Sequence, residues 1–140
     1  MKLSEVEFDE VVFCSPNTPI AEIVNILKKK MIRAVFIGDP ENVVGMVSDQ
    51  LIFESIGDGK DIARMKAMDI MRTDIPIFDI NTPIEIAYEK SMQTPYGVFA
   101  IKKEGKVIGE ISKKRISLIY SDLQKNKIYD LENRIKTLRM

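Results

Sequence analysis

The decapeptide PNTPIAEIVN at residues 16–25 has a near copy, INTPIEIAYE, at residues 80–89. Both copies contain Asn-Thr-Pro-Ile, and both continue with the spacing of apolar residues that is typical of an amphipathic helix. A second copy of so particular a stretch points to an internal repeat, and a repeat would decide the architecture of the whole chain.

The similarity extends well beyond these two stretches. A shift of 64 positions, which carries Asn17 onto Asn81, also superimposes further identical residues without a gap: Ile37 on Ile101, Val43 on Val107, Gly45 on Gly109, Ser48 on Ser112 and Ile52 on Ile116. Polarity is kept between the identities, since RAVFI at 33–37 falls on GVFAI at 97–101. We conclude that the chain contains two copies of one unit.

Each copy predicts the same order of elements. A short strand, at 11–14 or 75–78, is followed by a helix for which Thr18 or Thr82 suits the N-cap, with proline at the next position. In the second copy Glu85 would complete a capping box with Thr82. Two strands follow, at 34–37 and 43–47 or at 98–101 and 107–111, and a further helix begins near Ser48 or Ser112.

A single unit of about 55 residues buries too little surface to be comfortable alone, so the two copies should share a core. We therefore expect a mixed α/β (α+β) fold of two pseudo-symmetric β-α-β-β-α repeats packed together, plus a C-terminal helix. The expected divisions are 1–64 for the first repeat with its linker, 65–122 for the second repeat and 123–140 for an amphipathic helix.

Composition excludes several classes of function. The 21 basic and 21 acidic residues cancel, which argues against a general nucleic-acid binder. Cys14 is the single cysteine, so an intrachain disulfide is excluded and a reducing compartment, the cytoplasm, fits best. The chain has no histidine, which excludes Cys-His and Ser-His catalytic pairs and argues against a transition-metal site. We expect no enzyme, because no nucleophile–base pair can be assembled from these motifs. We expect no membrane protein, because no apolar run approaches roughly 20 residues.

The order of motifs resembles the tandem CBS domain pair, also called the Bateman module. VVFCSPNTPI at 11–20 and IPIFDINTPI at 75–84 look like the family's first strand and helix start. MKAMDIMRTD at 65–74 looks like its lead-in to a repeat. VVGMVSDQL at 43–51 and VIGEISKKR at 107–115 look like its glycine–hydrophobic–Ser/Thr element. The resemblance covers about residues 3 to 122.

The resemblance implies a sensor rather than an enzyme. In such pairs AMP, ADP, ATP or S-adenosylmethionine lies in a cleft between the repeats as a regulatory ligand, and no cofactor is required. Two pairs often associate, so a homodimer is expected. CBS pairs normally regulate an attached domain; here a separate regulated protein is expected instead.

By resemblance, nucleotide candidates lie on the first strands, at the start of the second strands and in the glycine–serine elements: Cys14, Arg33, Ala34, Val35, Gly45, Ser48, Asp49, Phe78, Gly97, Val98, Gly109, Ser112 and Arg115. The family places an acid or amide three residues after the Ser/Thr, where a carboxylate accepts bonds from the ribose hydroxyls. Leu51 and Arg115 stand there, and neither can accept a hydrogen bond. Asp49 lies two residues too early.

Structural roles also account for several of these residues. Ser48 and Ser112 can be plain helix N-caps, and Arg33 can be solvated rather than bound to a phosphate. Gly45 and Gly109 can mark a close approach to a base or to the other repeat.

The chain ends on a second amphipathic pattern. Ile128, Leu131, Ile135 and Leu138 are spaced three, four and three apart, which predicts a helix with one apolar seam. A helix of roughly three turns is not stable alone, so the seam should pack on its own repeat or on a second chain.

The leading hypothesis is a stand-alone regulatory CBS pair that senses an adenosine-type nucleotide and acts on a separate protein. The alternative is a ligand-free homodimeric interaction module with vestigial clefts. A weaker third hypothesis is a nucleic-acid-binding accessory protein, although no aromatic platform accompanies the basic end.

Overall fold

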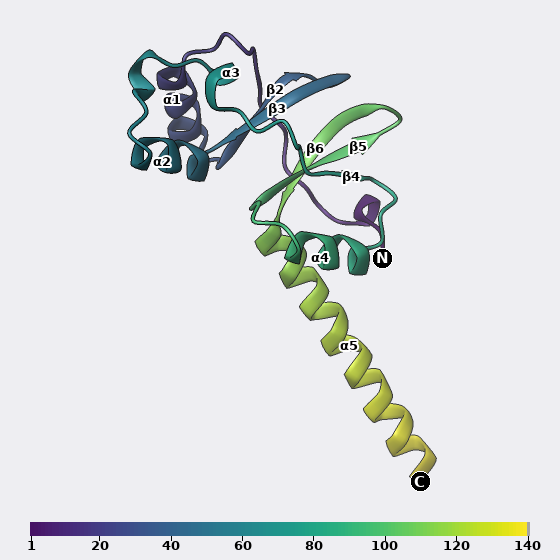
Figure 1. Ribbon diagram of the computed structural model, residues 1–140. Helices are drawn as coiled ribbons and strands as arrows, with labels where there is room; N and C mark the ends of the chain where they lie inside the picture. The colour runs from purple at the N-terminus through teal and green to yellow at the C-terminus, as the bar shows by residue number, and fades with distance from the viewer. Residues whose placement is uncertain (140) are drawn as a thin grey trace.

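The computed structural model describes residues 1–139 and contains two three-stranded sheets built alike (Figure 1). The first repeat comprises β1 (Phe13–Cys14), α1 (Ile20–Lys30), β2 (Ala34–Asp39), β3 (Asn42–Ser48) and α2 (Asp49–Gly57). The second comprises β4 (Ile77–Asp79), α4 (Ile84–Met92), β5 (Val98–Lys103), β6 (Lys106–Ser112) and α5 (Lys113–Arg139). In each sheet the first strand runs parallel to the second, and the second antiparallel to the third. The predicted β-α-β-β-α repeat is confirmed twice.

The predicted threonine caps are wrong. Helices α1 and α4 begin one residue later than expected, and Pro19 or Pro83 occupies the cap position without a side-chain bond. The first free N–H groups are satisfied by the backbone instead: Ile20 donates to the Met65 carbonyl at 2.9 Å, and Ile84 to the Met1 carbonyl at 2.8 Å. A neighbouring segment thus supplies the acceptor expected from the hydroxyl.

The third strand of each sheet forms a backbone bridge with the segment that precedes the other repeat in the chain. The N-terminal segment, residues 1–9, lies on the second repeat, where the Asp9 and Glu110 backbones exchange hydrogen bonds of 2.8 and 2.9 Å. The segment 65–72, which includes α3 (Ala67–Ile70), lies on the first repeat, where Met46 and Arg72 exchange bonds of 2.9 and 3.0 Å. The two lead-in segments are therefore exchanged between the repeats.

The same exchange explains the repeated glycine. A β-carbon on Gly45 would lie 2.5 Å from the sulfur of Met71, and one on Gly109 would lie 2.2 Å from the ring of Phe8. Both distances are shorter than any real contact. The close approach is therefore to the lead-in segment of the other repeat, because Met71 falls in the predicted second repeat and Phe8 in the predicted first, and this agrees with one of the two alternatives that the sequence suggested.

The two repeats share one apolar layer. Phe36 and Met46 of the first repeat are buried together with Ala100 and Val107 of the second. Each repeat also has a core of its own between its sheet and its helices. The shared core expected from the small size of the unit is confirmed.

The helix expected at 123–140 is not a separate element. Helix α5 runs without a break for 27 residues, because neither glycine nor proline interrupts the sequence after Lys113. Its first part packs on α4, with the rings of Tyr88 and Tyr120 stacked at 4.0 Å. From Lys125 to Arg139 every residue is exposed, and Figure 1 shows this part extending away from the body. The seam does not pack on its own repeat.

The divisions of the chain at residues 64 and 122 stay a prediction, although α5 crosses the second of them without a break. Among residues 1–139, none of the helices combines the length and the apolar character needed to cross a bilayer.

Candidate ligand clefts between the repeats

Two clefts lie between the repeats at positions that the 64-residue shift relates. The first cleft is formed by the β3–α2 junction, Arg72 and the start of β5, with the lining residues Arg33, Met46, Ser48, Asp49, Gln50, Leu51, Glu54, Arg72, Pro95, Tyr96, Gly97 and Val98. The second cleft is formed by the N-terminal segment, the end of α1 and the β6–α5 junction, with the lining residues Asp9, Glu10, Val12, Lys30, Met31, Ile32, Arg33, Val98, Glu110 and Ser112.

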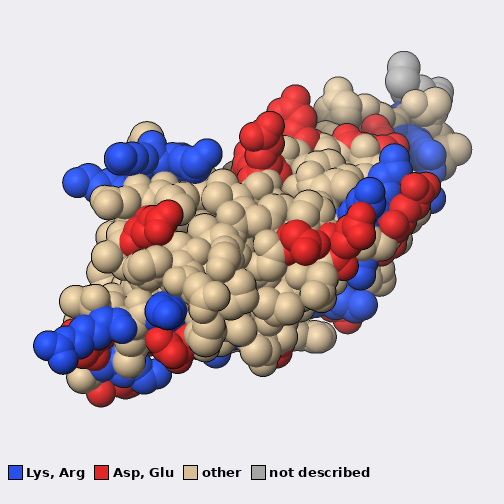
Figure 2. All heavy atoms as spheres, turned by 90° about the horizontal axis from the view of Figure 1, so that it is seen from above, with Lys and Arg blue, Asp and Glu red and all other residues tan. Residues whose placement is uncertain are grey.

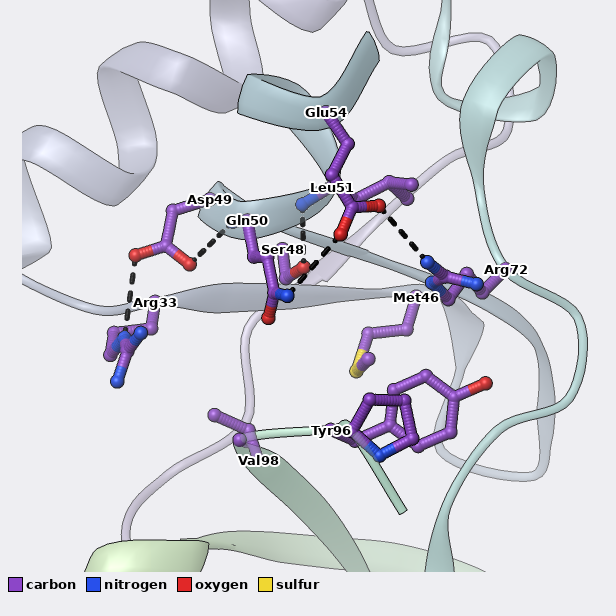
Figure 3. Close-up of a pocket in the computed structure, with 12 residues that line it drawn as sticks. Arg33, Met46, Ser48, Asp49, Gln50, Leu51, Glu54, Arg72, Tyr96 and Val98 are labelled. Atoms are coloured by element: carbon purple, nitrogen blue, oxygen red, sulfur yellow. Dashed lines mark hydrogen bonds and ion pairs between the residues drawn. The ribbon is translucent and has the colours of Figure 1, made fainter. Parts of the chain in front are cut away.

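The first cleft is filled by its own side chains (Figure 3). Its free volume is about 50 Å³. The Arg72 guanidinium lies 5.7 Å from the centre of the Tyr96 ring and 3.2 Å from the Glu54 carboxylate. The Tyr96 hydroxyl donates to Asp74, and this bond lowers the pKa of Asp74. Ligand sites in proteins measure roughly 300–1,000 Å³, so no nucleotide fits this arrangement.

The hydroxyl and acidic candidates of the first cleft are already engaged. The Ser48 hydroxyl accepts the Leu51 N–H at 3.1 Å, which confirms the N-cap interpretation of Ser48. Arg33 donates to the Asp49 carboxylate at 3.3 Å, although its side chain remains 69% exposed. Leu51 packs against the core of the first repeat. The other oxygen of Asp49 accepts the Gln50 N–H at 2.7 Å, so both of its oxygens already have partners.

The second cleft is more than ten times larger, at about 630 Å³. The first repeat contributes Lys30 and Arg33 to its wall, whereas the end of the N-terminal segment and the residue after it contribute Asp9 and Glu10. Strand β6 contributes Glu110. This cleft therefore offers both signs of charge and enough room for a nucleotide-sized molecule.

Glu110 is the buried acid of the second cleft. Its side chain belongs to a residue only 6% exposed, and within residues 1–139 its Oε2 has no hydrogen-bond partner. The 64-residue shift pairs it with Met46, which is buried in the shared layer. Desolvation, and then the nearby Asp9 carboxylate, raise the pKa of Glu110 to about 7.

This carboxyl should make the stability of the protein depend on pH. Between the ordinary glutamate pKa and about 7, the folded protein keeps a proton that the unfolded chain releases, so stability present at low pH is lost as the pH rises through 7. We expect the free energy of unfolding to fall by about 3 kcal/mol between pH 4 and pH 8, relative to Glu110→Gln. Urea titrations at several pH values measure it.

A matched control is Glu10→Gln, which removes an exposed acid from the same cleft. Its stability profile should follow that of the wild type. Identical profiles for the wild type and Glu110→Gln would show that the buried carboxyl does not titrate as argued.

Ser112 and Arg115 also have structural partners. The Ser112 hydroxyl accepts the Arg115 N–H at 3.1 Å, so Ser112 caps α5 while lining the second cleft. The Arg115 Nε donates to the Glu7 carbonyl at 2.8 Å, and its Nη2 lies 3.7 Å from the Glu7 carboxylate. Arg115 is thereby held against the N-terminal segment and does not line the second cleft.

The structure brings six of the thirteen candidates to a cleft: Arg33, Ser48, Asp49, Gly97, Val98 and Ser112. The other seven do not line either one. Cys14 and Val35 lie in the core of the first repeat, Phe78 stacks on Phe99 in the core of the second, and Ala34 lies in the shared layer. Gly45 and Gly109 lie under the lead-in segments, and Arg115 is held by Glu7.

Burial also decides the chemistry of the cysteine. Desolvation, with a smaller effect from Glu22, raises the pKa of the Cys14 thiol. The thiol stays protonated at neutral pH, which agrees with a packing role.

Four cleft or cleft-closing residues were not predicted from the sequence: Asp9, Arg72, Tyr96 and Glu110. For Glu110 the sequence contained a signal. The 64-residue shift aligns its carboxylate with Met46, and the other residues of the predicted strand at 107–111 are apolar. Asp9 and Arg72 gave no such signal, because the exchange of lead-in segments has no local signature. Within residues 1–139, no three acidic or cysteine side chains are grouped so that they could hold a metal ion.

Comparison with known proteins agrees with this architecture. The family described as CBS domain matches residues 3–58 and 67–122. No curated protein sequence matches the chain. An uncharacterized conserved protein from Pyrococcus horikoshii has a similar fold, with a TM-score of 0.75, 19% identity, and coverage of 86% of this chain and 91% of that one.

Two further structures with this fold carry CBS in their descriptions. A CBS domain protein from Pyrobaculum aerophilum, complexed with AMP, gives a TM-score of 0.71 at 21% identity, covering 81% of this chain and 88% of that one. A CBS-pair protein from Arabidopsis thaliana gives 0.70 at 15% identity, covering 89% and 96%. With two family matches that span most of its length, the chain belongs to the CBS domain family as a tandem pair of CBS domains.

Proposed function

We propose that this protein is a regulatory, non-catalytic CBS pair that binds an adenosine-type ligand in the second cleft and acts on a separate partner protein. The observation that carries the proposal is the difference in volume, about 630 Å³ against about 50 Å³ for the first cleft. The ligand class, which includes AMP, ADP, ATP and S-adenosylmethionine, is suggested by the AMP complex of the Pyrobaculum aerophilum relative.

The chemistry of the second cleft suits such a ligand. Lys30 and Arg33 can bind a phosphate group, since both are exposed cations on the same wall. Asp9 and Glu10 can accept hydrogen bonds from ribose hydroxyls, which replaces the acid missing from the usual helix position. Val12, Ile32 and Val98 supply apolar surface for a base.

Calorimetry with AMP, ADP, ATP and S-adenosylmethionine tests the proposal. Ile32→Trp places a large ring in the second cleft, and we expect at least a tenfold loss of affinity, about 1.4 kcal/mol. The matched control is Tyr96→Trp, at the equivalent position in the first cleft. It should change the affinity by about twofold at most.

Thermal melts of both variants verify that they fold. If the native protein binds none of the four ligands, the sensor proposal fails. If Tyr96→Trp weakens binding as much as Ile32→Trp does, the ligand is not confined to the second cleft.

A second proposal concerns association. We propose that two chains pair through the apolar seam of α5, as the homodimeric module would require. Ile128, Leu131, Ile135 and Leu138 are 57%, 56%, 48% and 85% exposed. These four side chains leave a row of apolar surface in water, and a second seam would cover it as in a coiled coil.

Leu131→Asp combined with Leu138→Asp should convert the dimer to a monomer of 16.0 kDa, because each carboxylate would be buried in the pairing surface. Light scattering measures the mass. The control is Asn126→Asp combined with Asn133→Asp, which adds the same charge on the opposite face and should leave the dimer intact. A monomeric wild type, or a dimer that survives the seam substitutions, would contradict the pairing.

Nucleic acid is not proposed as a partner. On the face drawn in Figure 2, lysines and arginines form separate groups interspersed with acids and uncharged residues. The formal net charge of zero provides no general attraction to phosphate backbones.

A further inference from the structure

The second cleft contains a buried acid for which the proposed function has no use so far. Oε2 of Glu110 is shielded from solvent, and among residues 1–139 nothing donates a hydrogen bond to it. Buried polar atoms are rarely left unpaired in proteins, and each exception calls for an explanation. Because Glu110 also lines a cavity of about 630 Å³, a small rotation of its side chain toward that cavity would let a bound molecule supply the missing partner.

The surrounding charges do not hold Glu110 as an anion. Asp9, at the end of the N-terminal segment, and the next residue, Glu10, are acidic themselves. Lys30 and Arg33 line the same cleft, but in the described part of the chain neither forms an ion pair with Glu110, and Arg33 is paired with Asp49. The neighbouring β5 residue across the ladder is Ala100, which brings no charge.

Glu110 therefore exists in its neutral form over an unusually wide range. Its pKa is raised to about 7 by desolvation and by Asp9. A protonated carboxyl group is a donor and an acceptor at once, whereas an ionised one only accepts. The neutral form pairs with a partner that presents one acceptor beside one donor.

We propose that Glu110, as a neutral carboxyl group, recognises the base of the ligand in the second cleft by donating to a ring nitrogen and accepting from an adjacent amino group. Adenine presents this pattern, with its 6-amino group beside a ring nitrogen acceptor. The inference rests on the proposed function and adds to it the group of the ligand that is recognised.

The other repeat provides the design of the test. Its equivalent residue is Met46, so Glu110→Met installs a side chain that this fold already accepts at the same strand position. Glu110→Gln keeps one donor and one acceptor but does not titrate. Together the two variants separate hydrogen bonding from packing and from charge.

Calorimetry with AMP at pH 6 and pH 8 measures the effect. For a group that titrates near 7, the neutral fraction falls from about 0.9 to about 0.09 between these values, so wild-type affinity should fall about tenfold more than that of Glu110→Gln. Comparison with Glu110→Gln is needed because the phosphate of AMP also titrates in this range. Glu110→Met should lose at least tenfold at pH 6.

A second ligand, which lacks the amino group that Glu110 would recognise, tests that contact directly. Purine riboside 5′-phosphate lacks the 6-amino group, and it should bind the wild type and Glu110→Gln at least tenfold more weakly than AMP does. Glu110→Met should not distinguish the two ligands. Thermal melts without ligand establish that each variant is folded.

The outcomes separate the two proposals. If AMP binds and Ile32→Trp abolishes binding, but Glu110→Met binds AMP as tightly as the wild type, base recognition by Glu110 is wrong and the proposed function stands. Base recognition by the neutral carboxyl is equally overturned if the wild type and Glu110→Gln show the same pH dependence. If AMP and the other adenosine ligands do not bind at all, both proposals are overturned.

Discussion

Residues 1–64 and residues 65–140, expressed as separate chains, are each expected to give no cooperative thermal unfolding. The cut removes from each repeat the lead-in segment that completes it. The first repeat loses the Met65 carbonyl that accepts from Ile20, and the bridge between Met46 and Arg72. The second loses Leu3, which is fully buried in its core, and the bridge between Asp9 and Glu110.

Each half would also expose its side of the shared layer, including Phe36 in one half and Val107 in the other. Circular dichroism during heating measures the transition of each half. Mixing the halves is the control, because the exchanged segments and the shared layer can then re-form, and the cooperative transition should return. A cooperative melt by either half as a monomer would show that a single repeat is sufficient.

Phe36→Ala is expected to lower the free energy of unfolding by about 3–5 kcal/mol. The ring is completely buried in the layer that both repeats share, so its loss leaves a cavity bordered by both sheets. This is a large part of the stability of an ordinary domain. Urea unfolding followed by circular dichroism measures the change.

The control for Phe36→Ala is Phe53→Ala, which removes the same side chain from a position that is 72% exposed on α2. It should alter stability by about 0.5 kcal/mol at most. Because the layer is common to both repeats, the tyrosine signal of the Tyr88–Tyr120 stack should change in the same transition as the helical signal. Separate transitions, or equal losses for both variants, would contradict a shared core.

The strands and helices could be predicted from the sequence because their signals are local. The apolar pattern of residues 34–37 and 98–101, and the glycine and serine of both repeats, recur at a constant spacing. The exchange of lead-in segments could not be predicted. The partners Asp9 and Glu110 are about a hundred residues apart, and backbone hydrogen bonds leave no mark on side-chain composition.

The candidate site was predicted less well for a related reason. Resemblance gave residues on the correct strands, but it could not tell which side chains reach a cleft. Cys14 and Phe78 point into their own cores, while Tyr96 closes one cleft by its contacts with Asp74 and Arg72. The difference between the clefts depends on such pairings between distant residues.

Helix α5 begins in the wall of the second cleft and ends far from it. Ser112 lines that cleft and accepts the hydrogen bond that caps the helix. With 27 residues, the helix is about 40 Å long. The helix therefore acts as a lever arm, because a rotation of about 5° at its first turn displaces its far end by roughly 3.5 Å. A small rearrangement around Ser112 is thus amplified into a displacement of several ångströms near Leu138.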